Sequence, residues 1–412
     1  MQRDADVVVV GGGPAGATTA WSLAREGIDV LLLDRARFPR QKPCAEYLSP
    51  AASRILDAMG ALRAVESAGA AQLSGMRIRA PNGVTFEGRF AAAHGYPGFR
   101  DCGLALPRFE LDPLLLECAR HAGARVHDGW HVTGLVRDGA GRVCGVTGTD
   151  ATERSMRVTA CVVVGADGLR SVVARRLGVA HCARMPRRIA FVAHYRDVGG
   201  IGESGEMHVE ADGYVGLAHV GFGRTNVALV VPARLARSAS GDAEGFLTRW
   251  LMGHPHLAER FSAATRLTAV QVTGPFASHA RSAAAPGAAL VGDAADFFDP
   301  FTGEGIYAAM RGGELLGPHV AEAVRAPDAR RADHALAAYD RARRREFRGK
   351  WLVEKLVGLA VAHPPLLNHA ARVLAKRTGM ADILVGVAGN FVPPSEVLRA
   401  RFLFDLMRPA PR

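Results

Sequence analysis

Short apolar runs separated by glycine-containing turns open the chain. Residues 7–10 are four consecutive valines, and a β-branched run of this kind suits a strand buried on both faces. A glycine-rich turn follows, and a helical stretch then extends to about Glu26, where Gly27 fits the helix stop. Residues 30–33 have the apolar character of a second strand. These segments together predict one βαβ unit.

The middle of the chain has a pattern that favours strands. Residues 76–90 are predicted as a hairpin that turns at residues 81–83, Pro-Asn-Gly. Residues 111–123 carry the periodicity of an amphipathic helix. Short strand-like segments alternate around glycine turns between residues 125 and 164, and residues 189–274 are mostly strand-like as well. We therefore expect a second, sheet-rich part of the molecule here.

The last part of the chain predicts a return to a parallel sheet and then a series of helices. Residues 288–291 form an apolar strand, and long helical patterns run from about residue 303 to the C-terminus. We predict an α/β fold in which a Rossmann-like nucleotide-binding domain is interleaved with a sheet-rich substrate domain and followed by C-terminal helices. The predicted segments are 1–75, 100–186 and 275–330 for the nucleotide-binding domain, 76–99 and 187–274 for the substrate domain, and 331–412 for the helices.

Composition and charge narrow the class of protein. Of the 412 residues, 49% are hydrophobic and 22% are charged, as in an ordinary globular protein. The formal net charge is +11, but the basic residues are dispersed except between Arg341 and Arg348, so nucleic acid is not the expected partner. The six cysteines form no CxxC pair, so no metal site or disulfide framework is predicted and a cytoplasmic location is favoured. The first predicted strand begins too early for a signal peptide, and no apolar run predicts a membrane span.

One C-terminal segment suggests contact with a membrane surface. Residues 351–374 are helical and apolar, and the basic run 341–350 precedes them. Such a combination suits peripheral docking on an acidic membrane, where a lipid substrate could be collected. A helical cap on the nucleotide-binding domain is the alternative. The basic charge also fits an anionic substrate, a carrier protein or a merely solvated surface.

The turn after the first strand has the spacing of a dinucleotide-binding motif. Gly11 permits the tight turn, Gly13 lets the backbone approach a pyrophosphate, and Gly16 lets the helix and strand pack closely. The N-terminus of the helix that follows offers free N–H groups to phosphates. Asp34 ends the second strand about 20 residues later, where a carboxylate can accept hydrogen bonds from a ribose. The motif predicts a bound dinucleotide, and a glycine turn that only packs a helix on a strand is the alternative.

Two distant segments indicate which dinucleotide binds. Ala166-Asp167-Gly168 follows the apolar strand 161–164, and Gly292-Asp293-Ala294 leads to the segment 299–306. In the order and spacing of these motifs, the sequence resembles the FAD-dependent group that contains para-hydroxybenzoate hydroxylase, flavin halogenases and geranylgeranyl reductases. The resemblance covers most of residues 1–320. It implies an FAD-binding domain of the glutathione-reductase type and an oxidoreductase activity.

The resemblance also implies roles for single residues. Asp293 looks like the residue that hydrogen-bonds the ribityl chain of FAD, while Asp167 and Gly168 resemble the motif that supports both FAD and a nicotinamide donor. Arg108 resembles the arginine that contacts the FAD linker. Asp167 could instead be a turn residue, and Arg108 could simply pair with Asp112 on a helix face. The full set implied to bind FAD is Gly11, Gly13, Pro14, Ala15, Gly16, Asp34, Arg35, Cys44, Arg108, Val132, Asp167, Gly168, Gly292, Asp293, Pro300, Gly303, Gly305 and Ile306.

The catalytic candidates surround the expected flavin. Gly303-Glu304-Gly305 opens a predicted helix, and its backbone N–H groups could face the N1–C2=O edge, where reduced flavin is negatively charged. Glu304 could instead be a first-turn carboxylate that the helix dipole favours. Cys44 and Tyr214 are the other candidates, because one is expected near the isoalloxazine and the other in the substrate sheet. For both, simple packing is the alternative.

Local strings distinguish the branches of this group. Residues 42–50, Lys-Pro-Cys-Ala-Glu-Tyr-Leu-Ser-Pro, resemble the Lys-Pro-Cys-Gly-Gly-x-Leu-Ser-Pro segment of geranylgeranyl reductases but lack its paired glycines. Geranylgeranyl reductases also have a Tyr-x-Trp-x-Phe-Pro string, of which residues 213–218 keep only the tyrosine. Residues 43–349 contain no lysine, and the Trp-x-Trp-x-Ile-Pro string of halogenases is missing, which argues against halogenation.

The sequence therefore predicts an FAD-dependent oxidoreductase that acts on a hydrophobic small molecule. We favour a monooxygenase that hydroxylates a hydrophobic or aromatic compound, because the reductase substrate string is degraded. A double-bond reductase of isoprenoid or lipid chains is the alternative among enzymes, and a non-catalytic flavin-binding module is the alternative from another class. No second Gly-x-Gly-x-x-Gly motif exists for a nicotinamide domain, so we expect electrons from transiently bound NAD(P)H or from a partner.

Overall fold

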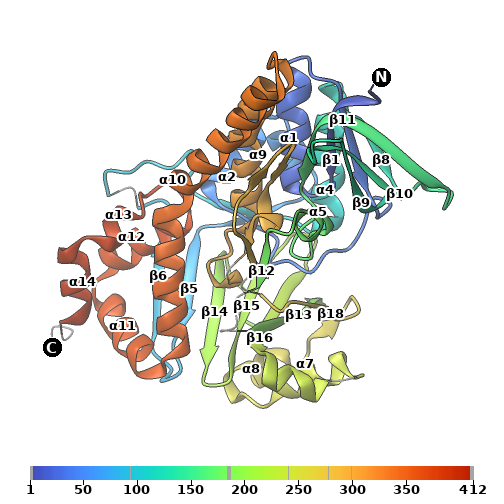
Figure 1. Ribbon diagram of the computed structural model, residues 1–412. Coiled ribbons are helices and arrows are strands. Elements are labelled where there is room, and N and C mark those ends of the chain that lie inside the picture. Colours follow the sequence, from blue (N-terminus) through green and yellow to red (C-terminus); the bar gives the residue numbers. More distant parts are fainter. Residues whose placement is uncertain are drawn as a thin grey trace.

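Two large sheets organise the chain and lie one above the other in Figure 1. The computed structural model describes residues 3–92, 94–182, 187–239, 241–276, 278–297 and 299–408. The outermost residues of the predicted terminal segments, 1–2 and 409–412, lie outside these ranges. The mixed α/β class predicted from the sequence is confirmed.

The upper sheet is mainly parallel. Its strands lie in the order β20, β21, β11, β1, β2 and β8, and all neighbours except β20 and β21 run parallel. The bounds are β1 (Ala5–Val10), β2 (Val30–Asp34), β8 (Arg125–Asp128), β11 (Ser155–Gly165), β20 (Ala284–Ala285) and β21 (Ala288–Leu290). The valines of β1 are fully buried or nearly so, as expected for a central strand covered on both faces. The apolar runs predicted as strands 7–10, 30–33 and 161–164 therefore all lie in this sheet.

Helices and an antiparallel extension cover the two faces of the upper sheet. Helix α1 (Pro14–Arg25) packs against α4 (Arg108–His121) and α9 (Gly305–Arg325). The strand β10 (Val143–Thr149) pairs with β9 (His131–Arg137) on one side and with the first half of β11 on the other. The amphipathic helix predicted for residues 111–123 is present, but it begins three residues earlier than expected, at Arg108.

The lower sheet forms a platform beneath the first. Its order is β17, β13, β16, β15, β14, β5 and β6, and β18 also pairs with β13. The bounds are β5 (Gly75–Arg79), β6 (Thr85–Arg89), β13 (Arg188–Arg196), β14 (Ser204–Glu210), β15 (Gly213–His219), β16 (Thr225–Pro232), β17 (Thr265–Arg266) and β18 (Gln271–Thr273). The predicted hairpin at residues 76–90 is the β5–β6 pair.

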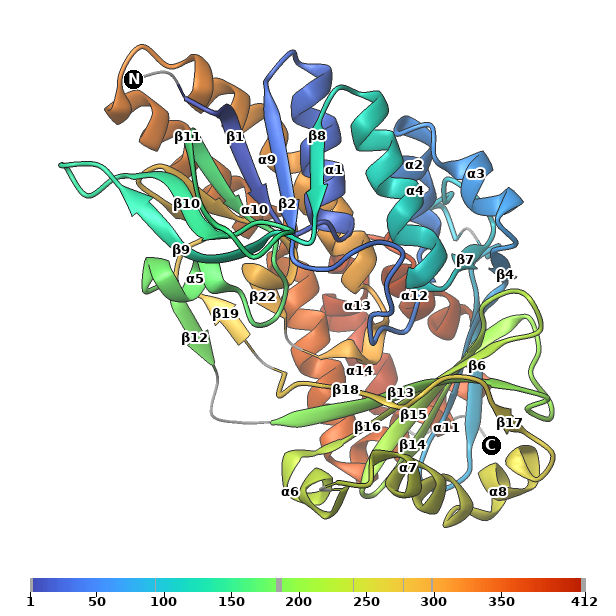
Figure 2. The same ribbon diagram turned by 90° about the vertical axis from the view of Figure 1, so that its right-hand side faces the viewer.

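Side chains of the lower sheet alternate between two cores, as the period of a strand requires. On β16, Val227 and Leu229 face the outer core, where α7 (Ala243–Met252) and α8 (Pro255–Phe261) cover the sheet, as Figure 2 shows. Ala228 and Val230 face the inner core instead. The inner face is the one that looks toward the upper sheet, and it supplies the floor of the site described below.

The C-terminal helices connect the two sheets. Helix α10 (Ala329–Ala362) packs on α9 beside the upper sheet and then continues downward along the lower sheet in Figure 1. Helices α11 (Pro364–Lys376) and α12 (Thr378–Ala388) pack on β6, and α13 (Ser395–Leu398) and α14 (Ala400–Met407) follow. Much of the C-terminal region thus covers the lower sheet rather than the nucleotide-binding sheet. No helix within the described ranges is both long and apolar enough to cross a membrane.

Short elements complete the fold. The helices are α2 (Pro50–Ala58), α3 (Leu62–Ser67), α5 (Val172–Leu177) and α6 (Ala233–Ala236), with 3-10 turns η1 (Arg237–Ala239), η2 (Gly292–Ala294) and η3 (Pro300–Thr302). Two small sheets consist of β3 (Tyr47–Leu48), β7 (Gly103–Ala105) and β4 (Ala71–Leu73), and of β12 (Ala180–Cys182), β19 (Ser278–Ala280) and β22 (Asp296–Phe297).

Candidate active site

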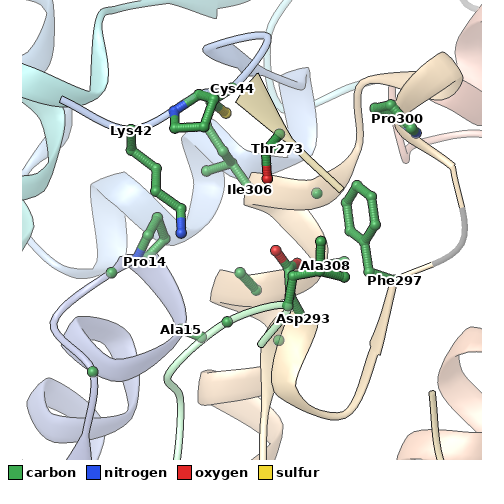
Figure 3. A pocket seen from close by; sticks show the side chains of 18 of the residues that line it. Pro14, Ala15, Lys42, Cys44, Thr273, Asp293, Phe297, Pro300, Ile306 and Ala308 are labelled. Carbon is green, nitrogen blue, oxygen red and sulfur yellow. The ribbon is translucent and has the colours of Figure 1, made fainter. Parts of the chain in front are cut away.

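A cavity of about 840 Å³ lies between the carboxyl ends of the upper strands and the inner face of the lower sheet. Figure 3 shows part of it, with the start of α1 on one side and the segment 293–308 on the other. Ligands of open α/β sheets bind at this edge. Every residue predicted to bind FAD lines the cavity except Gly16, and the catalytic candidates Cys44, Tyr214 and Glu304 line it as well.

The glycine turn has the geometry that each glycine was predicted to provide. Gly11 adopts a φ of +109°, which favours glycine, and a β-carbon there would overlap the backbone of Ala166. A β-carbon at Gly16 would overlap the carbonyl oxygen of Gly11, so this glycine lets α1 pack on the turn instead of facing the cavity. Gly13 caps α1 and leaves the N-terminus of the helix open toward the cavity.

Three cations surround this helix N-terminus. The Nη2 atoms of Arg108 and Arg40 lie 3.4 Å and 3.8 Å from the position that a β-carbon on Gly13 would take. Lys42 extends across the pocket toward Pro14 in Figure 3. Cations beside free N–H groups fit the two negative charges of a pyrophosphate. Arg40 and Lys42 were not predicted to bind FAD, although their place in the loop after β2 was a usable signal.

The Arg108 side chain forms the helix-face pair that was the alternative for it. Its Nε and Nη2 atoms donate to the two carboxylate oxygens of Asp112, at 2.6 Å and 2.8 Å. Asp112 also pairs with Arg40 at 3.0 Å. One buried carboxylate therefore orients two guanidinium groups that line the cavity. The pairing and the predicted contact with the FAD linker are compatible, because each guanidinium keeps further N–H groups.

Asp34 and Asp167 use much of their hydrogen-bonding capacity within the chain. Asp34 accepts from the backbone N–H of Gly12 at 2.6 Å and of Ala36 at 2.7 Å, so it holds the glycine turn against the end of β2. Asp167 accepts from the hydroxyl of Ser171 at 2.5 Å and from the N–H of Val172 at 2.6 Å, at the start of α5. The turn role considered for Asp167 is present, and its contact with a cofactor stays a prediction.

Asp293 differs from these two carboxylates. Its side chain lines the cavity, and no hydrogen bond or ion pair engages it in the described part of the chain. Burial raises the pKa of the Asp293 carboxyl group, while the charges of Lys42 and Arg108 oppose the increase. Asp293 is half-buried in the cavity wall, and a polar group withdrawn from water without a protein partner is costly unless a ligand satisfies it. The hydroxyl groups of a ribityl chain would satisfy Asp293, so this side chain fits FAD.

The start of α9 has the form expected at a flavin edge. Gly303 adopts a φ of +70° and ends η3, and α9 then begins at Gly305 with N–H groups that have no partner within the helix. The Glu304 side chain is 4% exposed, and its Oε2 atom lies 3.0 Å from Nζ of Lys350 on α10. The backbone therefore presents the positive end of α9 to the cavity while the Glu304 carboxylate is tied to a distant helix.

Tyr214 belongs to a buried polar chain on the substrate side. Its hydroxyl donates to Oδ1 of Asp299 at 2.6 Å, and Arg188 donates to Oδ2 of the same carboxylate at 2.5 Å. Burial and the charge of Asp299 raise the pKa of Tyr214 well above its usual value, so its phenol stays protonated. Arg188 and Asp299 were not predicted, because their contact joins residues 111 positions apart.

Cys44 is held by a network that the sequence analysis also missed. Its carbonyl oxygen accepts from Nδ2 of Asn226 at 2.9 Å. Glu46 accepts from the same amide nitrogen at 2.9 Å and contacts Nε2 of His194 at 2.6 Å. Glu46 has a φ of +61°, which explains why a glycine suits this position in the related string. Burial raises the pKa of the Cys44 thiol, so the thiol is neutral.

A second cavity of about 180 Å³ adjoins the first. It lies between β5, β6 and the helices α10 to α14, and its lining is apolar apart from Thr302, Glu304, Lys350 and Glu354. All four of these polar residues also line the first cavity. The two cavities therefore meet beside the start of α9.

The chain belongs to the FAD-binding domain family, which it matches over residues 4–349. It is 34% identical to digeranylgeranylglycerophospholipid reductase 2 of Methanopyrus kandleri over 78% of each chain. It is 29% identical to menaquinone reductase of Mycobacterium tuberculosis over 95% of this chain and 92% of the relative. A shorter match, 36% identical over 42% of this chain and 41% of the relative, is to 6-methylpretetramide 4-monooxygenase of Streptomyces rimosus.

The fold is also found in solved structures. A geranylgeranyl bacteriochlorophyll reductase-like protein of Thermoplasma acidophilum superposes with a TM-score of 0.78 at 24% identity, over 98% of this chain and 99% of that one. The protein is therefore an FAD-dependent oxidoreductase, and the predicted membership of the hydroxylase and geranylgeranyl reductase group is confirmed. The named relatives include both a reductase and a monooxygenase.

Proposed function

We propose that this protein is an FAD-dependent reductase that saturates carbon–carbon double bonds in a long hydrophobic chain of the isoprenoid type. The second cavity carries the proposal, because its lining is apolar and it meets the first cavity beside α9. Such a lining suits a hydrocarbon chain, which needs no hydrogen-bonding partners. Two relatives are named for the reduction of a digeranylgeranylglycerophospholipid and of menaquinone, and both compounds carry isoprenoid chains.

The residues of the chain bind and orient, and FAD supplies the redox chemistry. Bound FAD, once reduced, provides the electron pair that a double bond needs for saturation. Asp293 and the cations of Arg40 and Lys42 would hold the cofactor in the first cavity. The N-terminal N–H groups of α9 would stabilise the negative charge of its reduced form. The apolar walls of the second cavity would keep water away from the reacting carbons.

We further propose that NAD(P)H reduces the flavin by transient binding. The sequence has no second glycine motif for a separate nicotinamide domain. The first cavity is large enough to be shared in turn by a donor and a substrate, because it extends from the glycine turn to the lower sheet. Stopped-flow reduction of the flavin by NADH and by NADPH, followed by its absorbance, tests this donor. No reduction by either compound would point to a protein donor.

Hydroxylation of an aromatic compound is the second candidate. Small residues of the inner face, Ala190, Gly216 and Ala228, line the first cavity near Tyr214. A phenolic substrate placed there would meet the polar chain of Tyr214 and Asp299, which could bind its hydroxyl group. The tryptophan and Phe-Pro of the reductase string are also absent from this strand. The match to a monooxygenase supports this reading as well.

Oxygen distinguishes the two reactions. The flavin of the purified protein is reduced without oxygen and mixed with a digeranylgeranylglycerophospholipid, with menaquinone or with a panel of phenols. A reductase reoxidises its flavin anaerobically and adds two hydrogen atoms to each saturated bond, as mass spectrometry would detect. A monooxygenase forms product only when oxygen is admitted, and that product gains one oxygen atom. The second result would overturn the proposed reductase.

A matched pair of variants tests the role of the second cavity. Ala360 of α10 lines this cavity, whereas Ala362 on the same helix is exposed and does not. Ala360→Phe should raise the KM for the lipid because the added ring fills the space, while Ala362→Phe should leave it unchanged. FAD affinity should be the same in both variants. Equal KM values for the lipid would mean that the chain does not enter this cavity.

We also propose that the protein collects its substrate from an acidic membrane surface in the cytoplasm. Several large apolar side chains are exposed on α10 and α14: Leu352, Leu356, Leu359, Leu403, Phe404 and Met407. Leu356 and Leu403 also line the second cavity, so its mouth lies at this surface. The exposed arginines Arg345 and Arg348 precede the patch on α10 and complement anionic lipids. Flotation with vesicles that contain anionic lipids should carry the protein upward, and Leu356→Glu with Leu403→Glu should abolish this binding.

A further inference from the structure

Three charged side chains stand where the two cavities meet. Glu304 precedes the first turn of α9, and Lys350 and Glu354 lie one turn apart on α10. All three line both cavities. In an otherwise apolar second cavity, charged groups at this point are expensive to keep unless they take part in binding or chemistry.

The ammonium group of Lys350 forms an ion pair with only one of the two carboxyl groups, that of Glu304. Lys350 lies 3.0 Å from Glu304, donates to Oδ1 of Asn390 and places its Nζ atom 4.6 Å above the ring of Tyr307. The carboxyl group of Glu354 forms no hydrogen bond or ion pair with the residues that the structure describes. Lys350 therefore neutralises Glu304, and Glu354 has no direct counter-ion.

The surroundings of Glu354 favour its protonated form. Burial raises the pKa of the Glu354 carboxyl group to about 8, and the negative charge of Glu304 adds to this effect. Lys350 on the same helix opposes the increase, and Asp299 before η3 reinforces it. The charges that act on Glu354 come from the start of α9, from helix α10 and from the segment before η3. At neutral pH the side chain is therefore a carboxylic acid that faces both cavities.

We infer that Glu354 is the proton donor for the saturated double bond, an inference that rests on the proposed reductase function. Saturation adds a hydride to one carbon and a proton to the other. Bound FAD in its reduced form would supply the hydride and become oxidised. The O–H bond of Glu354 would break, and its proton would form the second C–H bond with the π electrons. Lys350, one turn away, stabilises the carboxylate that is left. Solvent then returns the proton.

Tyr214 and Cys44, the other catalytic candidates with a proton to give at neutral pH, are less suited to this step. The hydroxyl group of Tyr214 already donates to Asp299, and burial raises its pKa well above the usual value. Burial raises the pKa of the Cys44 thiol as well. Both groups are weaker acids than a carboxylic acid with a pKa of about 8. Of Glu354, Tyr214 and Cys44, Glu354 therefore has the pKa closest to the range in which general acids work at neutral pH.

The test compares Glu354→Gln with Glu354→Asp and with the control Glu322→Gln, which removes an exposed carboxylate from α9. The flavin of each holoprotein is reduced without oxygen, and its reoxidation by a digeranylgeranylglycerophospholipid is followed across pH. The rate of flavin reoxidation should fall in the wild type and the control as the pH rises through about 8. At saturating lipid, flavin reoxidation in Glu354→Gln should be about 100-fold or more slower than in the wild type, and its rate should not fall further above pH 8. Glu354→Asp should regain part of the reoxidation rate, and this rate should again fall as the pH rises.

An infrared titration provides a readout that does not depend on turnover. The oxidised wild type and the control should show a carboxylic acid C=O band that disappears near pH 8, and Glu354→Gln should lack it. FAD affinity should be the same in all variants. If Glu354→Gln does not fold, Glu354→Asp replaces it. A shift of the C=O band in Glu354→Asp would assign the band to residue 354, and an unshifted band would overturn the role of Glu354 as the proton donor.

The outcomes separate the two proposals. If the wild type and Glu354→Gln saturate the lipid at the same rate, the role of Glu354 is overturned and the reductase function stands. A missing infrared band would overturn that role too. A wild type that never saturates the lipid would overturn the reductase function, and the donor role would fall with it.

Discussion

Two cavity-lining aspartates provide a controlled test of the cofactor site. Asp167 accepts three hydrogen bonds at the start of α5, from Ser171, Val172 and Val173. Asp293 accepts none from the described residues, although burial raises its pKa. If Asp293 is reserved for FAD, its removal should affect cofactor binding, whereas removal of Asp167 should affect the stability of the protein itself.

The expected magnitudes follow from the number and kind of lost contacts. A hydrogen bond to a charged group contributes about 1.5–3 kcal/mol, and about 1.4 kcal/mol corresponds to a factor of ten in affinity. Asp293→Ala should therefore weaken FAD binding by about 10- to 100-fold and leave the stability of the apoprotein unchanged or slightly higher. Asp167→Ala removes the carboxylate that accepts from the first N–H groups of α5 and should destabilise the apoprotein by about 1–2 kcal/mol.

Two measurements on the apoproteins distinguish these effects. Titration with FAD, followed by the quenching of its fluorescence, gives the affinity of each variant. Denaturant unfolding in the absence of FAD gives the free energy of unfolding. Two results would refute the assignment of Asp293 to FAD. Asp293→Ala could bind FAD with wild-type affinity, or it could destabilise the apoprotein as much as Asp167→Ala does.

Two further predictions concern packing and pH. Gly16→Ala should lower the FAD content and the melting temperature, because the new β-carbon overlaps the carbonyl oxygen of Gly11 and forces α1 away from the turn; unchanged FAD content in the purified variant would contradict this. Burial opposes the ionisation of Glu206, but hydrogen bonds from His208 and Arg260 hold its pKa at about 2, below the ordinary value of about 4.5. The stabilisation is therefore present above pH 4.5 and is lost as the pH falls toward 2, so Glu206→Gln should flatten the decline of the melting temperature over this range. Parallel pH profiles of variant and wild type would exclude that contribution.

Features encoded by adjacent residues were predictable. The valines of β1, the spacing of the glycine turn and the hairpin at residues 76–90 follow from local periodicity and turn chemistry, and the structure contains all three. The cofactor-lining segments were found for the same reason, since each motif immediately follows a strand of the upper sheet and the strands end at a common edge. The start of α4 was missed by three residues, because Pro107 and Arg108 lie before the apolar periodicity begins.

Contacts between distant segments were not predictable from one sequence. Glu46 is buried against His194 although 148 positions separate the two residues, and nothing in the local pattern of either indicates the other. The same holds for Glu304 and Lys350, which join the start of α9 to the middle of α10. A charged residue in an amphipathic helix normally faces water, so only the packing of α10 against the cavities reveals Glu354 as a half-buried acid that lines both.

The sequence by itself determined the cofactor class, because a dinucleotide is recognised mainly by backbone geometry and by single residues at fixed offsets from strands. The tertiary structure alone decided what surrounds the reacting side of the flavin. That space is bounded by the inner face of the lower sheet and by helices from the end of the chain, and its volume, polarity and ionisation depend on which distant side chains pack together. Local periodicity specifies which face of an element is apolar, but it carries no information about the partner that covers that face.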